Sequence, residues 1–274
     1  MGFTMSSLPD YENPPVVEVA MGVQFAPLEG LSVAHIGLYW RTIRDVFLRC
    51  EEQPPIPPVV ENLAAPEVGS RMMFQVGGKP DMPRVWFLNQ SGEQMVQIQR
   101  DRFVHNWRKM PSGEAYPRYP AVKKHFEKYW AGFCKFLQSE GLPHPQVDQL
   151  ELAYVNHIKQ GEGWQSLADI QNLFTTFKWR TRSDFLPPPE NVRWSMKFLL
   201  PDDMGRLHVD AMPVRIQEDK SLVMSLSLTV RGKPADAVAD TGTRAWFDLA
   251  REWIVKGFAD LADKETDLLW KKQP

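Results

Sequence analysis

Polar and aromatic side chains gather in one stretch of the first half of the chain, residues 97–108. If this stretch is one β-strand, Arg100 and Arg102 point to the same side, because side chains alternate between the faces. Their planar guanidinium groups could bind a carboxylate or phosphate at two points. The alternative is a solvated sheet face on which these arginines pair with carboxylates such as Asp101. The candidate binding residues of this stretch are Gln97, Gln99, Arg100, Arg102, Asn106, Trp107 and Arg108.

A second group of candidates lies on a predicted strand in the middle of the chain. Glu151 and His157 share one face of this strand, and a desolvated carboxylate and imidazole with shifted pKa values could act as an acid and a base. The two residues lie too far apart along the strand to touch each other. Glu18 takes the matching place in the first half without a histidine, which favours a structural role of the glutamate, such as holding a backbone turn or an arginine. The binding candidates here are Tyr154, Asn156 and His157.

The common sequence signatures of enzymes and metal sites are missing. Residues 77–80 have neither the spacing of a phosphate-binding loop nor the Ser or Thr that follows it. His208 and Asp210 point to the same face of a predicted strand, but no closely spaced set of ligand residues indicates a metal site. Cys50 and Cys134 lie in predicted helices with no adjacent base. The sequence therefore predicts no cofactor and no metal, and it leaves open whether the protein is an enzyme.

Composition narrows the class of protein. The 274 residues are 43% hydrophobic and 11% aromatic, which is enough for a sizeable core, and the net charge is −2. This charge disfavours nucleic-acid binding, because nucleic-acid binders collect cations to neutralise phosphates, but it leaves room for a local basic stripe. The chain has only two cysteines, and residues 1–12 lack the pattern of a signal peptide, which together favour a cytoplasmic protein. It also has no long uncharged apolar run, so we expect that it does not enter a membrane.

The chain also contains an internal similarity with a constant offset. Residues 17–20 (VEVA) match residues 150–153 (LELA), an offset of 150 − 17 = 133, and the same offset relates the prolines at 54–55 to those at 187–188. Such a period predicts a repeated architecture. We predict a flexible N-terminus over residues 1–12, a first half over 13–145 and a second half over 146–274.

Each half is expected to run β-α-β-β-β-α. Apolar alternation and turn residues predict strands at 16–25, 71–76, 84–89, 94–104, 150–158, 192–200, 206–216 and 222–230. Apolar residues at helical spacing predict helices at 33–47, 121–140, 167–177 and 243–271. The expected fold is α+β, with antiparallel sheets, helices on one face and a pseudo-two-fold axis. A saddle like that of the TATA-box-binding protein and a helix-grip sheet both fit this order.

Several motifs together resemble a known family. They are NPPVVEV at 13–19, QIQRDRF at 97–103, NWR at 106–108, YPRY at 116–119 and ELAYVNHI at 151–158. In combination they resemble a sporadically distributed family of uncharacterised prokaryotic proteins of about this length. The resemblance implies a bacterial, intracellular, full-length unit and assigns no catalytic residue. The patchy distribution would suit an accessory role in defence or in mobile elements.

Three classes of function follow from the sequence. The first is a non-catalytic binding or interaction protein that presents a polar sheet face to a peptide, a protein or a small anionic ligand. The second is an enzyme with a cleft between the halves, which requires Glu151, His157 or His208 to line a shared pocket. The third is nucleic-acid binding by a saddle-like sheet, which the net charge disfavours. The sequence does not predict the oligomeric state.

Overall fold

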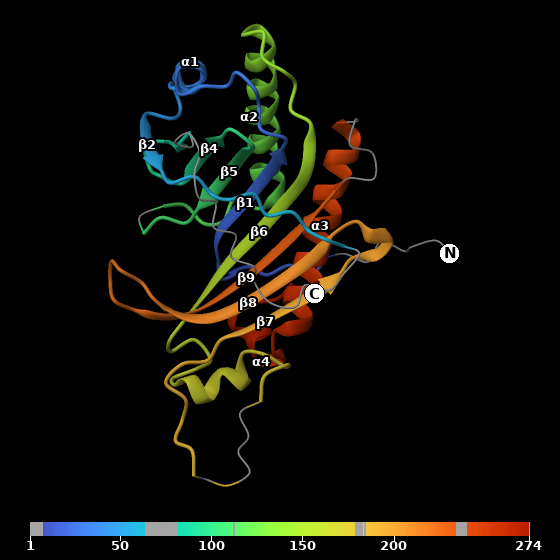
Figure 1. Cartoon of the computed structure of the whole chain (residues 1–274). Helices are drawn as coiled ribbons and strands as arrows, with labels where there is room; N and C mark the ends of the chain where they lie inside the picture. The colour runs from blue at the N-terminus through green and yellow to red at the C-terminus, as the bar shows by residue number, and fades with distance from the viewer. Residues whose placement is uncertain are drawn as a thin grey trace.

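In the part of the chain that the structure describes, nine strands form one antiparallel sheet in the order β2-β3-β4-β5-β1-β6-β9-β8-β7 (Figure 1). This computed structural model describes residues 8–63, 82–111, 113–178, 183, 185–233 and 240–273, without the side chains of 240 and 241. The strands are β1 (Val16–Phe25), β2 (Arg49–Gln53), β3 (Arg84–Leu88), β4 (Gln94–Gln99), β5 (Arg102–Arg108), β6 (Val147–Lys159), β7 (Trp194–Leu199), β8 (Arg206–Arg215) and β9 (Leu222–Gly232). The predicted α+β class with a large antiparallel sheet is confirmed, and residues of both predicted halves share this one sheet.

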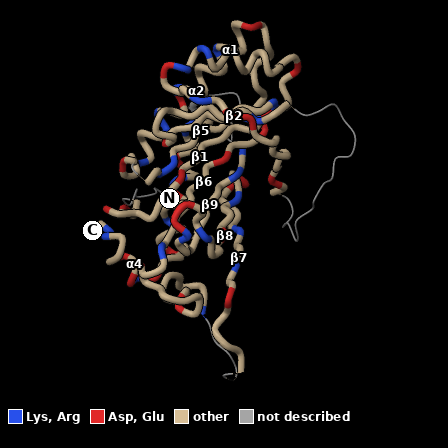
Figure 2. Tube along the Cα trace, turned by 90° about the vertical axis from the view of Figure 1, so that its left-hand side faces the viewer, with Lys and Arg blue, Asp and Glu red and all other residues tan. Residues whose placement is uncertain are grey.

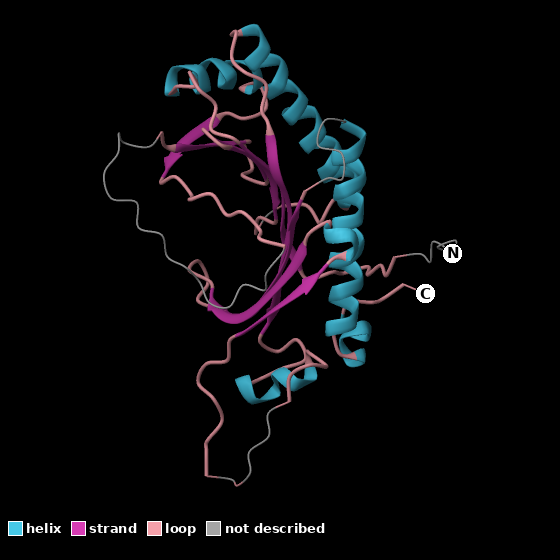
Figure 3. Cartoon of the chain, turned by 45° about the vertical axis from the view of Figure 1, so that its right-hand side comes forward, coloured by secondary structure: helices cyan, strands magenta, loops and turns pink. Residues whose placement is uncertain are grey.

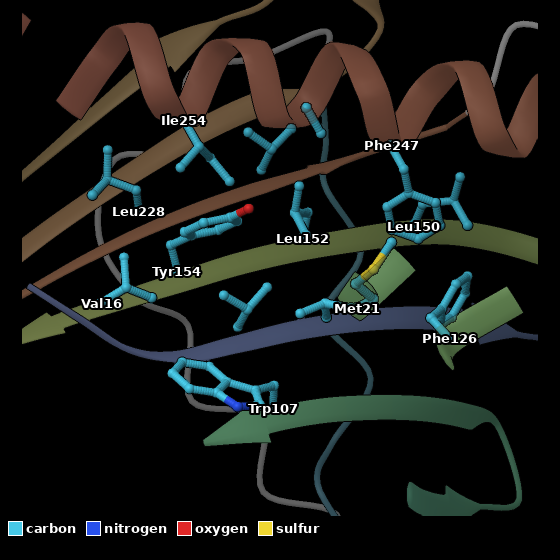
Figure 4. Packing of buried hydrophobic residues seen from close by; sticks show 14 of the residues in the cluster. Val16, Met21, Trp107, Phe126, Leu150, Leu152, Tyr154, Leu228, Phe247 and Ile254 are labelled. Carbon is cyan, nitrogen blue, oxygen red and sulfur yellow. The ribbon is translucent and has the colours of Figure 1, made fainter. Parts of the chain in front are cut away.

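Two long helices, α2 (Tyr119–Ser139) and α3 (Asp240–Leu261), cover the same face of the curved sheet (Figure 3). The alternation of β1 explains this arrangement, because Val19, Met21 and Val23 are fully buried on the helix side. Figure 4 shows Met21 in the layer of apolar side chains that fills the space between the sheet and α3. The other helical elements are α1 (Val33–Ile43), α4 (Lys264–Leu269) and the short 3₁₀ helices η1 (Leu167–Asn172) and η2 (Pro201–Asp203).

The opposite face of the sheet is polar, and we call it the polar face. In an antiparallel sheet, residues that lie opposite each other on neighbouring strands point to the same side. Gln24 of β1 lies opposite Arg102 of β5 and Gln149 of β6, so these three side chains share the polar face. Among the described residues no long helix covers them, which leaves their polar groups to be satisfied by other parts of the chain.

The predicted single strand over residues 94–104 is wrong. The chain forms a hairpin instead, in which β4 and β5 pair and Gln99 lies opposite Arg102. Arg100 and Asp101 form the turn, and the carbonyl oxygens of both residues accept backbone hydrogen bonds from the end of β1 and the loop after it. Arg100 therefore lies exposed in the turn and does not share a strand face with Arg102.

Other elements also differ from the prediction. The helix expected over residues 33–47 ends at Ile43, and the unpredicted strand β2 follows, so Cys50 lies in an exposed strand and not in a helix. The helix expected over 167–177 is the short η1, and the one expected over 243–271 is divided into α3 and α4. The strand predicted over 71–76 lies outside the described residues.

Residues 1–7 of the predicted flexible N-terminus lie outside the described residues, whereas the chain around Tyr11 is held in place. The Tyr11 side chain is buried, and its ring packs edge-on against Phe258 and Trp270. The backbone N–H groups of Glu12 and Asn13 donate to the carbonyl oxygens of Lys271 and Trp270, so the segment before β1 is tied to the end of the chain. None of the helices predicted from the sequence could cross a bilayer. Among the described residues, the structure likewise contains no helix that is long and apolar enough to do so.

Candidate binding face

An extended segment of the chain lies across the polar face. Residues 54–62, which we call the crossing segment, follow β2 and pass in front of the sheet, on the side away from α2 and α3 (Figures 1 and 3). Four prolines, at 54, 55, 57 and 58, favour an extended conformation and remove four backbone donors. The peptide groups that remain are therefore free to bond to other parts of the molecule.

Gln99 holds Ile56 by both of its backbone groups. The Ile56 N–H donates to Gln99 Oε1 at 2.8 Å, and Gln99 Nε2 donates to the Ile56 carbonyl oxygen at 2.8 Å. A side-chain amide has one acceptor and one donor group, so it can satisfy a peptide unit much as a neighbouring strand would. Gln99 is 6% exposed, and these two bonds are therefore shielded from water.

Two further glutamines hold the second part of the crossing segment. Gln24 Oε1 accepts from the Val59 N–H at 3.3 Å and from Arg102 Nη2 at 2.7 Å. Gln149 Nε2 donates to the Val59 carbonyl oxygen at 2.6 Å, and Gln149 Oε1 accepts from the Glu61 N–H at 2.9 Å. All of these contacts with the crossing segment involve its backbone, so they fix an extended chain without selecting its side chains.

The spacing of the glutamines matches the length of an extended chain. Gln99, Arg102, Gln24 and Gln149 form one row across β4, β5, β1 and β6. Three strand spacings of about 4.8 Å give about 14 Å from the first residue of this row to the last. Four residues of extended chain, at roughly 3.1–3.3 Å each, span about 13 Å. The extended crossing segment, which runs across the strands, therefore covers about the same length as the row of side chains beneath it.

A buried ion cluster holds the acidic end of the crossing segment. The Glu61 carboxylate accepts hydrogen bonds from Arg206 Nη1 at 2.8 Å and His208 Nε2 at 2.5 Å. The Glu61 side chain is 3% exposed, and its two partners on β8 are nearly as buried. Arg206 also donates to the carbonyl oxygen of Asn62 at 3.3 Å. Here the face recognises a side chain, in contrast to the backbone contacts of the glutamines.

The cluster favours the ionised form of Glu61. Burial by itself raises the pKa of this carboxyl, but the hydrogen bonds and charges of His208 and Arg206 together outweigh burial. The pKa of Glu61 therefore lies below its ordinary value of 4.5. The cluster is a site for a carboxylate that stays charged throughout the neutral range.

A second hydrogen-bonded chain crosses the polar face beside the first. Arg84 Nη1 and Trp86 Nε1 donate to Gln97 Oε1 at 3.0 and 2.8 Å. Gln97 Nε2 then donates to Asn106 Oδ1, and Asn106 Nδ2 donates to Glu18 Oε1, both at 2.6 Å. Burial raises the pKa of Glu18, although Asn106 and the nearby Arg108 act in the opposite direction. These partners are all internal, so this chain of bonds stiffens the sheet.

The predicted site residues divide between the two faces of the sheet. Gln97, Gln99, Arg102, Asn106, Arg108 and His157 belong to the polar face. Trp107, Tyr154 and Asn156 point to the helix side, where Trp107 packs against Tyr116. Arg100 belongs to neither, because it lies in the hairpin turn. The structure thus brings together six of the predicted residues. Within the described part of the chain, Gln99 and Arg102 are the two of these six that form hydrogen bonds with the crossing segment.

The residues of the possible acid–base site have separate partners. Glu151 accepts from Arg231 Nε at 2.5 Å, so this carboxylate holds an arginine, which is one of the two structural roles that the sequence suggests. His208 binds Glu61, and burial lowers the pKa of His157 elsewhere on the sheet. Of the two main pockets in the described part of the chain, neither is lined by more than one of these three groups, and we do not propose the enzyme alternative.

Four residues that make the site were not among the sequence candidates: Gln24, Gln149, Glu61 and Arg206. Gln24 interrupts the apolar run between Val23 and Phe25, and a polar residue in such a place is the kind of signal that could have found it. Glu61 follows a proline-rich stretch that contributes to the sequence analysis only through the internal offset of 133 residues. Its contact with Arg206 joins residues 145 positions apart in the sequence, and no local pattern predicts such a contact.

The described part of the chain contains no group of three or more His, Cys, Asp or Glu side chains arranged to hold a metal ion. Comparison of this chain with models of known protein families, with curated proteins and with solved structures found no match.

Proposed function

We propose that this is a non-catalytic binding protein whose polar face takes an extended polypeptide with an acidic side chain near one end. The crossing segment would then be an internal copy of the ligand. The observation that carries this proposal is the set of hydrogen bonds from Gln99, Gln24 and Gln149 to the peptide groups of residues 56–61. Bonds to the backbone supply affinity, and a pocket for one side chain supplies selectivity, as in other modes of extended-peptide recognition.

The charges on the polar face favour this kind of ligand over a nucleic acid. Cations such as Arg102, Arg108 and Arg206 alternate there with the carboxylates of Glu18 and Glu151, and Figure 2 shows both signs interspersed along the chain. A phosphate backbone needs a continuous cationic surface, and mixed charges do not provide one. A carboxylate placed between Arg206 and His208 needs only a single local site.

We further propose that the two halves arose by duplication and that the ligand crosses the axis between them. In support, Ala20 of β1 lies opposite Ala153 of β6, at the same offset of 153 − 20 = 133 that relates the repeated motifs. Glu18 lies opposite Arg108 in one half, and Glu151 lies opposite Arg231 in the other. Gln24 and Gln99 would then come from the first half, and Gln149, Arg206 and His208 from the second.

The test is to supply the segment as a separate peptide. Glu61→Arg places a cation against Arg206 and His208, which should displace the protein's own crossing segment and leave the face open. A fluorescein-labelled peptide with the sequence of residues 53–63 is then titrated into this variant and into the parent protein, and fluorescence anisotropy is recorded. We expect saturable binding to the variant and much weaker binding to the parent, whose tethered segment competes at roughly millimolar effective concentration.

Two matched variants control this experiment. Gln149→Leu in the Glu61→Arg background removes two backbone contacts and should weaken peptide binding roughly tenfold. Gln138→Leu makes the same substitution at an exposed position of α2, on the other side of the sheet, and should change nothing. A folded Glu61→Arg variant with mobile residues 54–62 and no affinity for the peptide would show that the crossing segment is only a structural cover.

A further inference from the structure

A cavity lies on the helix side of the sheet, away from the crossing segment. Its volume is about 80 Å³, and it lies between the segment before β1, the loop that leads into α2, and the middle of α3. Figure 4 shows its apolar wall, where Tyr154 lies among Val16, Leu228 and Ile254. The polar residues that line it are Asp10, Tyr11, Tyr116, Arg118, Tyr119, Tyr154, Asn156 and Arg251.

Arg251 brings to this cavity a cation that has no carboxylate partner among the described residues. Its guanidinium carbon lies 4.9 Å from the centre of the Tyr119 ring, and it forms no hydrogen bond or ion pair with any residue in the described part of the chain. The carboxylates nearby have other partners. Asp248 accepts from Tyr119 Oη at 2.9 Å and pairs with Lys123 at 2.7 Å, and Asp10 pairs with Arg118 at 2.9 Å. A partly buried guanidinium that lacks a carboxylate is a good site for an external anion.

Two phenols add a hydrogen-bond donor beside this cation. The hydroxyl oxygens of Tyr116 and Tyr154 lie 3.0 Å apart, so one hydroxyl donates to the other. The proton of the accepting hydroxyl has no acceptor among the described residues. Tyr154 is 5% exposed, and a phenol this buried is usually hydrogen-bonded. An oxygen of a ligand in the cavity would satisfy this remaining donor.

Arg118 builds the mouth of the cavity. Its backbone has φ of +72°, which is rare for a residue other than glycine. Its side chain donates to Asp10 and to the carbonyl oxygens of Tyr11 and Glu12, at 2.9 to 3.3 Å. These bonds hold the segment before β1 over the cavity, so Arg118 is already satisfied and Arg251 is the cation left for a ligand.

We infer that this cavity binds a small carboxylate with a short aliphatic body. The carboxylate would pair with Arg251 and accept the free phenolic proton, and the body would lie against the apolar wall of Val16, Leu228 and Ile254. The volume of about 80 Å³ is roughly half that of a cavity that holds one benzene molecule, which fits an acid of a few carbon atoms. This site would be independent of the polar face, because the two lie on opposite sides of the sheet.

Isobutyrate and isobutyramide form a matched pair of probes, because they share a shape and differ in charge. Each is titrated into the parent protein while the ¹⁵N–¹H resonances of the Tyr116, Tyr154 and Arg251 amides are followed. We expect saturable shifts with isobutyrate, and affinity for isobutyramide that is weaker by roughly tenfold or more, since a hydrogen-bonded charge pair is lost. Arg251→Gln should reduce isobutyrate affinity by a similar factor.

Lys256→Gln removes a charge from the same helix at a site paired with Glu252, outside the cavity, and should leave isobutyrate affinity unchanged. Tyr154→Phe should weaken isobutyrate binding while leaving the Glu61→Arg variant able to bind the peptide, which separates this site from the polar face. Equal affinity for acid and amide, the absence of saturable shifts in the parent protein, or equal losses in Arg251→Gln and Lys256→Gln would each overturn the inference.

Discussion

Glu61→Arg is expected to free the crossing segment and to accelerate hydrogen exchange at the Ile56 and Val59 amides roughly a hundredfold. Glu61 is 3% exposed between Arg206 and His208, and removing one partner of a buried ion cluster costs about 3 kcal/mol. A cation in its place adds repulsion. Because the segment can swing into water, the loss should appear as local opening and not as unfolding of the sheet. Exchange rates measured by NMR on the intact chain check this directly.

The double variant Glu61→Arg, Arg206→Glu restores opposite charges and is the control. It should recover most of the lost protection at Ile56 and Val59. Equal exchange rates in the parent protein and in Glu61→Arg would contradict the account, because they would mean that the ion cluster does not hold the segment.

Acid should release the same segment. The pKa of Glu61 is lower in the folded protein than in the unfolded chain, so its ionised form stabilises the attachment fully above about pH 4.5, and the attachment weakens as the pH falls through the folded value. Protonation of Glu61 therefore acts in the same direction as its replacement, and the segment should remain attached throughout the neutral range.

His105→Phe is expected to make the protein markedly more resistant to acid. His105 is fully buried on β5, its ring stacks on Tyr129, and neither ring nitrogen has a partner among the described residues. Burial, with a smaller contribution from His125, lowers its pKa to about 3 from the ordinary 6.5. Below pH 6.5 the imidazole of His105 therefore binds a proton in the unfolded chain but not in the folded protein.

The resulting loss of stability is about 1.4 kcal/mol for each pH unit, or about 3 kcal/mol between pH 6.5 and 4.5. The variant lacks this penalty. Its free energy of unfolding should therefore match that of the parent near pH 7 and exceed it by about 3 kcal/mol at pH 4.5. Urea unfolding at both pH values measures the difference. His144→Phe, at an exposed position, is the control and should keep the pH dependence of the parent. A parallel pH dependence in His105→Phe and the parent would show that His105 is not the acid-sensitive group.

The central strands of the sheet could be predicted from the sequence because they carry strong patterns. β1 alternates apolar residues with polar or small ones and matches the predicted strand at both ends, and α2 carries a clear apolar face. The hairpin at Arg100 could not be predicted in the same way. It has neither the Asn-Gly nor the Gly-rich dipeptide of common tight turns, and polar residues continue through it, so the pattern is that of one long strand.

The binding face was predicted only in part, for a physical reason. Arginines and aromatic residues stand out in a sequence, whereas Gln24 and Gln149 do not, because an uncharged amide on a strand is commonplace. What makes these glutamines special is the backbone of residues 54–62 lying over them, and that contact depends on the folded sheet. Likewise, nothing in the sequence distinguishes Glu61 from a surface glutamate, because its role depends on contacts with Arg206 and His208 of β8.

The most direct test of the proposed function follows the side-chain amide resonances of Gln24, Gln99 and Gln149. In the parent protein these groups bond to the crossing segment, and in Glu61→Arg they should move to the positions of solvated amides. Adding the unlabelled peptide with the sequence of residues 53–63 should return all three resonances to their parent positions. If the peptide leaves them at the solvated positions, the polar face does not bind an extended chain supplied from outside, and the proposed function is wrong.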